Sequence, residues 1–126
     1  MKRLLSVVVT LIIAPACAPT APLVLTPEAQ RITVGEADPG PGYQAIEGIE
    51  AEDGSGCGAF GTRGTFNGAL NKLRYQAGQL HADFIKIIST KEPYLTPAHG
   101  DNWACFHNEY SISAIAYKKT AATEAP

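Results

Sequence analysis

The chain has 126 residues, 45% of them hydrophobic, and a formal net charge of −2 at pH 7. This length suits one small domain, and a nearly neutral charge offers no electrostatic basis for binding nucleic acid. We therefore expect a single domain with no nucleic-acid partner.

The first sixteen residues have the layout of a secretory signal peptide. Lys2 and Arg3 supply positive charge, residues 4–13 form a mainly apolar run, and residues 14–16 are Ala-Pro-Ala. A run of this length is too short to remain as a helix across a bilayer. We expect residues 1–16 to be removed and the rest of the chain to be exported.

Two processing routes fit the bond before Cys17. Ala14 and Ala16 match an ordinary signal-peptidase site, but the cysteine after them resembles the lipobox of bacterial lipoproteins. In such proteins the thiol carries a diacylglyceryl group, and buried acyl chains contribute about 0.8 kcal/mol per CH₂. The resemblance implies that residues 17–24 form an acylated cysteine and a flexible tether. Because Ala18 is not the aspartate that retains many such proteins at the inner membrane, it also implies a lipid-anchored, periplasm-facing outer-membrane protein.

Downstream of the tether, the sequence predicts two strands before a helix. Residues 31–34 and residues 43–51 contain β-branched and aromatic side chains typical of strands, although the second segment does not alternate strictly. The glycine and proline cluster at residues 38–42 separates the two strands, because these residues favour turns.

The segment from Thr65 to Thr90 is the centre of the predicted domain. Its apolar side chains recur at spacings of three and four residues, which is the period of an amphipathic helix. The members of this apolar face are Phe66, Leu70, Leu73, Ala77 and Leu80. Thr65 or Asn67 can cap the first turn. We expect His81 to adopt the left-handed conformation that ends many helices, with a ligand or proton-carrier role as its alternative.

Two further strands complete the predicted sheet. Residues 84–88 form a short apolar run, and residues 112–117 are the most strand-like part of the C-terminal region. Residues 91–102 contain two prolines and a glycine and are expected to form a loop, and residues 119–126 a disordered tail. The expected fold is α+β, a small ββαββ-type sheet with one amphipathic helix packed on one face, within a domain of residues 25–118.

Two cysteines remain if Cys17 is acylated. An exported chain meets an oxidising compartment, where an even number of remaining cysteines favours pairing, so we expect a disulfide between Cys57 and Cys105. This bond would close a loop of 48 residues, which should stabilise the folded chain by about 4 kcal/mol.

Three features contain residue types found in catalytic or ligand sites. Residues 56–61 spell Gly-x-Gly-x-x-Gly, but the loop continues to Gly64 instead of entering a helix, which disfavours a dinucleotide site. Residues 99–109 contain histidine, cysteine and acidic residues without a recognised zinc spacing. A nucleophile formed by Cys105 with His107 requires a free thiol, which the disulfide excludes. We expect no catalytic residue, no metal site and no cofactor.

Residues 23–118 resemble a family of small bacterial envelope lipoproteins of unknown function. The residues that carry the resemblance are 25–28 (LTPE), 68–74 (GALNKLR), Ala77, Leu80, Ala82, Asp83 and 116–117 (AY). That family is similar, more distantly, to the outer-membrane sensor lipoprotein of the Rcs envelope-stress pathway, and the helix-to-strand segment resembles small heavy-metal-binding domains. The resemblance implies an α+β envelope domain without established chemistry.

The expected function is a non-catalytic structural or interaction module, with envelope stress sensing as a candidate role. The alternative is a small-ligand or metal-binding envelope protein. Tyr94 and Trp103 are the expected interaction residues, because aromatic side chains often anchor interfaces. A partner strand could also add at an exposed sheet edge. The expected partners are the membrane, through the lipid at Cys17, and other envelope proteins.

Overall fold

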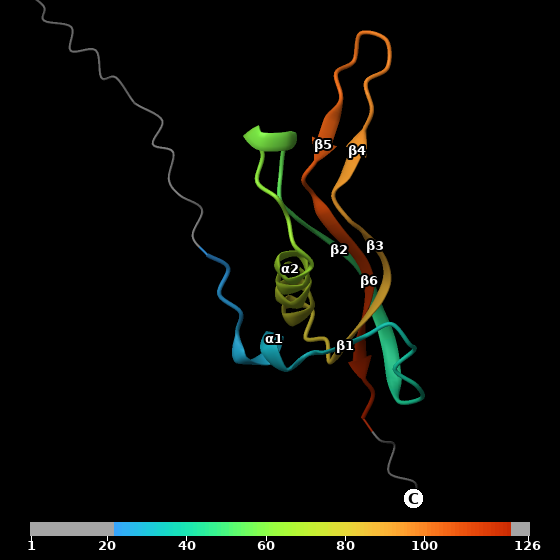
Figure 1. Cartoon of the computed structure of the whole chain (residues 1–126). Coiled ribbons are helices and arrows are strands. Elements are labelled where there is room, and N and C mark those ends of the chain that lie inside the picture. The colour runs from blue at the N-terminus through green and yellow to red at the C-terminus, as the bar shows by residue number, and fades with distance from the viewer. Residues whose placement is uncertain (1–21, 122–126) are drawn as a thin grey trace, which may run out of the picture.

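A computed structural model describes residues 22–121, and its main body is one helix lying across a four-stranded sheet (Figure 1). The elements in chain order are α1 (Pro27–Arg31), β1 (Thr33–Gly35), β2 (Tyr43–Asp53), a 3₁₀ turn (Gly58–Phe60), α2 (Phe66–Gln79), β3 (Phe84–Lys91), β4 (Tyr94–Thr96), β5 (Cys105–His107) and β6 (Tyr110–Lys119). The predicted signal peptide, Cys17 and residues 122–126 of the predicted tail lie outside the described residues.

The main sheet has the strand order β1-β3-β6-β2. β1 runs parallel to β3, and β6 runs antiparallel to both β3 and β2. β2 and β3 are therefore parallel to each other, with α2 as their connection and β6 between them. This arrangement confirms the expected α+β fold with one main helix on a sheet.

The core lies between α2 and the sheet, and it is small. Leu73, Ile85 and Ile112 are its largest fully buried side chains. The other buried hydrophobic residues are Ala29, Ile32, Ile49, Ala51, Ala69, Leu70, Ala77, Ala82, Ala114 and Ala116. Because most of these are alanines, which bury little area, each large side chain carries much of the hydrophobic stabilisation.

The start of α2 is fixed by two side chains that accept hydrogen bonds from backbone N–H groups. The Thr65 hydroxyl accepts from the Gly68 N–H at 3.0 Å, which is one of the two predicted N-cap bonds. Asp53, the last residue of β2, accepts from the Thr65 N–H at 2.9 Å and pairs with Lys72 at 3.1 Å. A Cβ on Gly68 would overlap the Asp53 carboxylate, which accounts for glycine at this position.

The outer edge of β2 is covered by two side chains of α2. Gln76 Nε2 donates to the Glu50 carbonyl at 2.9 Å, and Lys72 Nζ donates to the Glu52 carbonyl at 2.6 Å. An unpaired edge strand can pair with another chain, and donors placed on its carbonyls reduce that tendency.

The face of the sheet opposite α2 carries aromatic side chains and the β1–β2 connection. Phe84 packs edge-on against Tyr43 and Tyr117, with ring centroids 5.9 and 6.4 Å apart. Lys86 Nζ contacts Asp38 Oδ1 of the connection at 2.6 Å. Because the connection joins the two outermost strands, this ion pair fastens it to the sheet between them.

α1 and the turn after α2 close the end of the body at which the described chain enters. A Cβ on Gly78 of α2 would lie 3.1 Å from the Ala29 Cβ of α1, so the missing side chain lets the two helices approach each other. His81 has a φ of 53°, the left-handed conformation expected after this helix. The structure therefore supports the conformational reading of His81.

Several element boundaries differ from the sequence-based expectation. Residues 91–102 are not entirely loop, because Tyr94–Thr96 pair with β5. β3 continues to Lys91, and β6 continues to Lys119, which was expected to begin the tail. The short helix α1 was not expected. Pairing with neighbouring strands extends β3 and β6 and forms β4. A local residue pattern does not record which other segment will pair with it.

Replacing Asp53 with asparagine should lower the free energy of unfolding by about 1–2 kcal/mol near neutral pH. Partial burial raises the pKa of Asp53, but the Thr65 N–H and Lys72 outweigh it and hold that pKa below its usual value. The stabilisation is therefore present above the unfolded-state pKa of about 3.9 and is lost as the pH falls through the folded-state value. Urea unfolding of the variant and the unmodified protein, at neutral pH and at pH values below the Asp53 pKa, measures this stabilisation. Asp101→Asn is the control at an exposed position. A deficit of the same size in strong acid would contradict this assignment.

Candidate functional site

An apical lobe projects from the main body, and we define it as residues 54–64 and 92–109 (Figure 1). Its second part contains the hairpin of β4 and β5. These two strands are antiparallel, with Tyr94 opposite His107 at one end and Thr96 opposite Cys105 at the other. The hairpin extends beyond the main sheet, and the 3₁₀ turn lies beside β5. The lobe therefore lies at the end of the body away from α1.

A disulfide joins the two parts of the lobe. Cys57 and Cys105 are bonded, with their Cα atoms 5.4 Å apart, which confirms the predicted pairing. Cys57 also forms an isolated β-bridge with His107. The bond closes a loop of 48 residues, which stabilises the folded chain by about 4 kcal/mol in the chain-entropy treatment.

Asn108 forms a second link within the lobe, and it is the buried polar residue of the described chain. Its Nδ2 donates to the Gly56 carbonyl at 3.2 Å and to the Gly58 carbonyl at 2.9 Å. The backbone carbonyl of Asn108 accepts a hydrogen bond from the Gly64 N–H at 2.8 Å. The neighbouring Glu109 carboxylate accepts from the Gly56 N–H at 3.0 Å. These bonds fix the glycine-rich loop against the residues that connect β5 to β6.

The base of the loop depends on two glycines that lie against each other. Gly54 has a φ of +88°, and a Cβ there would overlap the backbone of Gly64 and of Asn108. A Cβ on Gly64 would overlap the Asp53 carbonyl. Only residues without side chains allow the two ends of the loop to come this close.

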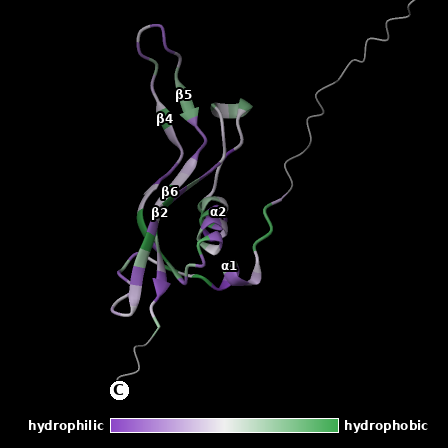
Figure 2. Ribbon diagram, turned by 180° about the vertical axis from the view of Figure 1, so that it is seen from behind, coloured by the Kyte–Doolittle hydropathy of each residue, from purple (hydrophilic) through white to green (hydrophobic). Residues whose placement is uncertain are grey.

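Large apolar side chains of the lobe are exposed to solvent. Trp103 is 92% exposed, Leu95 is 61% exposed, and Phe60 is fully exposed. Figure 2 shows hydrophobic colouring at the 3₁₀ turn and on β5, beside a more polar hairpin tip. Because these side chains contribute nothing to the core, they are candidates for contact with another molecule. We call Phe60, Leu95 and Trp103 the apical apolar residues.

The two predicted interaction residues have different environments. Tyr94, in the first β4–β5 pair, stacks on His107 with ring centroids 4.5 Å apart, and Lys91 Nζ lies 4.1 Å from the Tyr94 centroid. His107 Nε2 lies 2.9 Å from the Thr96 hydroxyl. Trp103 lies beyond the last pair of the hairpin. Tyr94 therefore stacks on a neighbouring side chain of the lobe and is 40% exposed, whereas Trp103 is almost fully presented to solvent.

Sequence reasoning did not single out Phe60 or Leu95. Phe60 had one available signal, since it is a large apolar residue within the glycine-rich segment 56–61 and outside any helical or strand period. Leu95 gave no comparable signal, because it stands in a segment read as a loop. Its exposure follows from its place in β4.

The residues weighed as ligands are not assembled into a metal site. Within residues 22–121, no group of three His, Cys, Asp or Glu side chains is placed to hold a metal ion. The glycine motif 56–61 is followed by further loop before α2 begins, as the sequence indicated. A Cβ on Gly61 would overlap the Ser55 carbonyl and the Asn108 amide, so this glycine permits close packing. Cys105 has no free thiol in the described structure.

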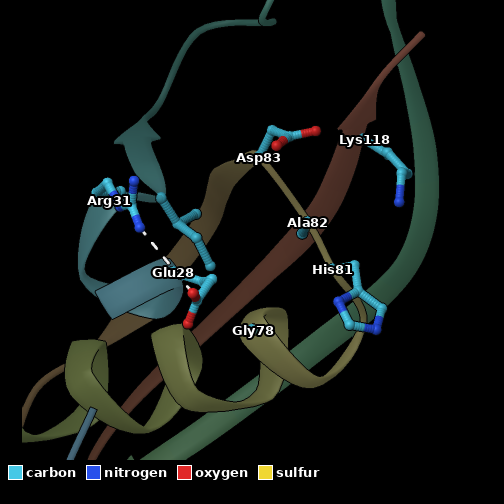
Figure 3. A pocket seen from close by; sticks show the side chains of 8 residues that line it. Glu28, Arg31, Gly78, His81, Ala82, Asp83 and Lys118 are labelled. Atoms are coloured by element: carbon cyan, nitrogen blue, oxygen red, sulfur yellow. Dashed lines mark ion pairs between the residues drawn. The ribbon is translucent and has the colours of Figure 1, made fainter. Parts of the chain in front are cut away.

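A shallow groove of about 470 Å³ lies at the other end of the body, between α1 and the end of α2 (Figure 3). Its charged or titratable lining residues are Glu28, Arg31, His81, Asp83 and Lys118. Arg31 pairs with Glu28 at 4.0 Å, and the Asp83 carboxylate accepts from the Lys119 N–H at 2.8 Å. Both acidic side chains are thus engaged by the protein itself, and the groove has the mixed charge of a solvated surface.

No protein-family model, no curated protein and no solved structure matches this chain. In the part of the chain from residue 22 to residue 121, no helix has both the length and the apolar character needed to cross a membrane.

Replacing Asn108 with alanine should lower the free energy of unfolding by about 1–3 kcal/mol, because the Gly56 and Gly58 carbonyls lose their shared donor. Urea denaturation of the oxidised protein measures the change. Asn102→Ala is the matched control, because Asn102 is an exposed asparagine near the hairpin tip. If both variants unfold at the same urea concentration as the unmodified protein, Asn108 does not hold the loop.

Proposed function

We propose that this protein is a lipid-anchored outer-membrane protein that faces the periplasm and acts as a non-catalytic interaction module. The observation that carries the proposal is the exposure of the apical apolar residues on a lobe whose two parts are joined by a disulfide. A surface held in place before binding loses little conformational entropy on association. Envelope stress sensing is the candidate role that would use this surface.

The positions of the two ends of the body support this assignment. The chain enters the body through α1, which packs near the end of α2, and the lobe lies at the other end (Figure 1). Cys17 precedes the first described residue, Pro22, by only five positions. An acyl group on Cys17 would therefore attach the α1 end, leaving the lobe directed toward other envelope components.

The chemistry of the exposed residues favours a partner with apolar pockets. Trp103 offers a large aromatic surface, and aromatic anchors carry much of the binding energy in many interfaces. Arg63 lies 5.4 Å from the Phe106 centroid, and Lys91 Nζ lies 4.1 Å from the Tyr94 centroid, so cationic side chains are also present in and beside the lobe. Aromatic residues and arginine are both enriched in protein interfaces.

The lipid anchor predicts a mass and a location. Intact mass spectrometry of the membrane-extracted protein should show a chain that begins at Cys17 and carries acyl groups, and Cys17→Ala should release the protein from the membrane fraction. Ala18→Asp is the matched variant, because it keeps the acylated cysteine and should move the protein to the inner membrane. A soluble, unacylated chain would refute the anchor.

The apical surface predicts position-specific cross-linking. A photoreactive aromatic residue at position 103 should give discrete adducts with envelope proteins in intact cells, and Leu95→Ala should weaken capture by roughly 10-fold if Leu95 belongs to the centre of the interface. Position 75 is the control, because Tyr75 is an exposed aromatic residue on α2, outside the lobe. Equal adducts from both positions, or none from position 103, would exclude the lobe as the interface.

A further inference from the structure

The apical lobe has no apolar core of its own. The buried hydrophobic residues of the described chain all belong to the body, and none lies in residues 54–64 or 92–109. Phe106 is only half-buried, although the Arg63 guanidinium covers part of its ring. The lobe therefore lacks the hydrophobic stabilisation that holds α2 on the sheet.

Hydrogen bonds around Asn108 and the disulfide hold the two parts of the lobe together. A hydrogen bond that water can replace contributes little net stability, so the covalent bond is the strongest of these links. Cys57 is exposed and Cys105 is half-buried, which makes the bond accessible from solution. The strongest link in the lobe is thus also one that a dissolved reductant can reach.

From these contacts we propose that the lobe is a redox-sensitive switch. With the disulfide intact, the glycine-rich loop and the hairpin are joined, and Phe60 and Trp103 are held in a defined arrangement. With the disulfide reduced, the loop and the hairpin separate while α2 and the main sheet remain folded. This inference concerns the order of the lobe, and it does not depend on the interaction function proposed above.

The chemical step is thiol–disulfide exchange with a dithiol reductant. A thiolate of the dithiol attacks the exposed Cys57 Sγ, the Sγ–Sγ bond breaks, and Cys105 leaves as a thiolate that takes up a proton. The second thiol of the reductant then attacks the mixed disulfide and releases Cys57, which is protonated in turn. Two electrons and two protons pass to the protein, and the reductant leaves as a disulfide.

The size of the effect follows from the ring that the disulfide closes within the folded body. The β2–β6 ladder already pairs Asp53 with Tyr110. The ring therefore contains only residues 53–57 and residues 105–110. For a ring this small, the chain-entropy treatment gives a shift of roughly 100-fold in the equilibrium between joined and separated parts.

Amide hydrogen exchange on the mature chain, with and without dithiothreitol, tests the switch. The Gly64 N–H donates to the Asn108 carbonyl and the Asn108 N–H donates to the Gly56 carbonyl, so both amides bridge the two parts of the lobe, and their exchange should accelerate by roughly 100-fold after reduction. The amide of Ile112, which lies in the core, should stay protected. Removing the reductant and adding glutathione disulfide should restore the original exchange pattern.

Two controls make the outcome decisive. The oxidised form of dithiothreitol should change nothing, and the double variant Cys57→Ser, Cys105→Ser should reproduce the reduced pattern without any reductant. The proposal is overturned if Gly64 and Asn108 keep their protection after complete reduction, because the hydrogen bonds alone then hold the lobe. It is equally overturned if Ile112 loses protection together with them, or if the double variant is unfolded, because the lobe is then not a separate unit.

Discussion

The packing of α2 against β2 and β6 is the interaction on which the rest of the structure depends. It buries the large side chains of Leu73 and Ile112 among a majority of alanines, and Ile85 of β3 belongs to the same core. Such a core supports only the elements directly beneath the helix, because hydrophobic stabilisation scales with the apolar area removed from water. The apical lobe contributes no residue to this hydrophobic core, and polar contacts and a disulfide join its two parts.

Asp53 stands at the point where these two kinds of stabilisation meet. It ends β2, pairs with Tyr110 across the ladder, and accepts the hydrogen bond that starts α2. Its partner Lys72 also donates to a carbonyl on the outer edge of β2. One carboxylate and one ammonium group thus connect the helix, the sheet edge and the base of the apical lobe.

The molecule has two chemically different ends. At the α1 end, a shallow groove with charges of both signs lies next to the point where the chain enters the body. At the other end, the lobe combines exposed apolar side chains with a disulfide and a buried asparagine. The proposed attachment at the α1 end and recognition at the lobe would use this difference between the two ends. The same lobe is the part whose order depends most on a bond that solvent conditions can change.

The sequence by itself determined the α+β class, the central helix with a cap at Thr65 or Asn67, the left-handed His81 and the pairing of Cys57 with Cys105. These features follow from local periodicity, local capping chemistry and the small number of cysteines. Only the tertiary structure decided that Tyr94–Thr96 form a strand, that Asn108 is buried and that Phe60 is exposed. Each of these depends on a partner outside the residue's own segment of chain, or on the absence of one. A local pattern records a residue's own preferences and contains no information about which distant segment folds against it.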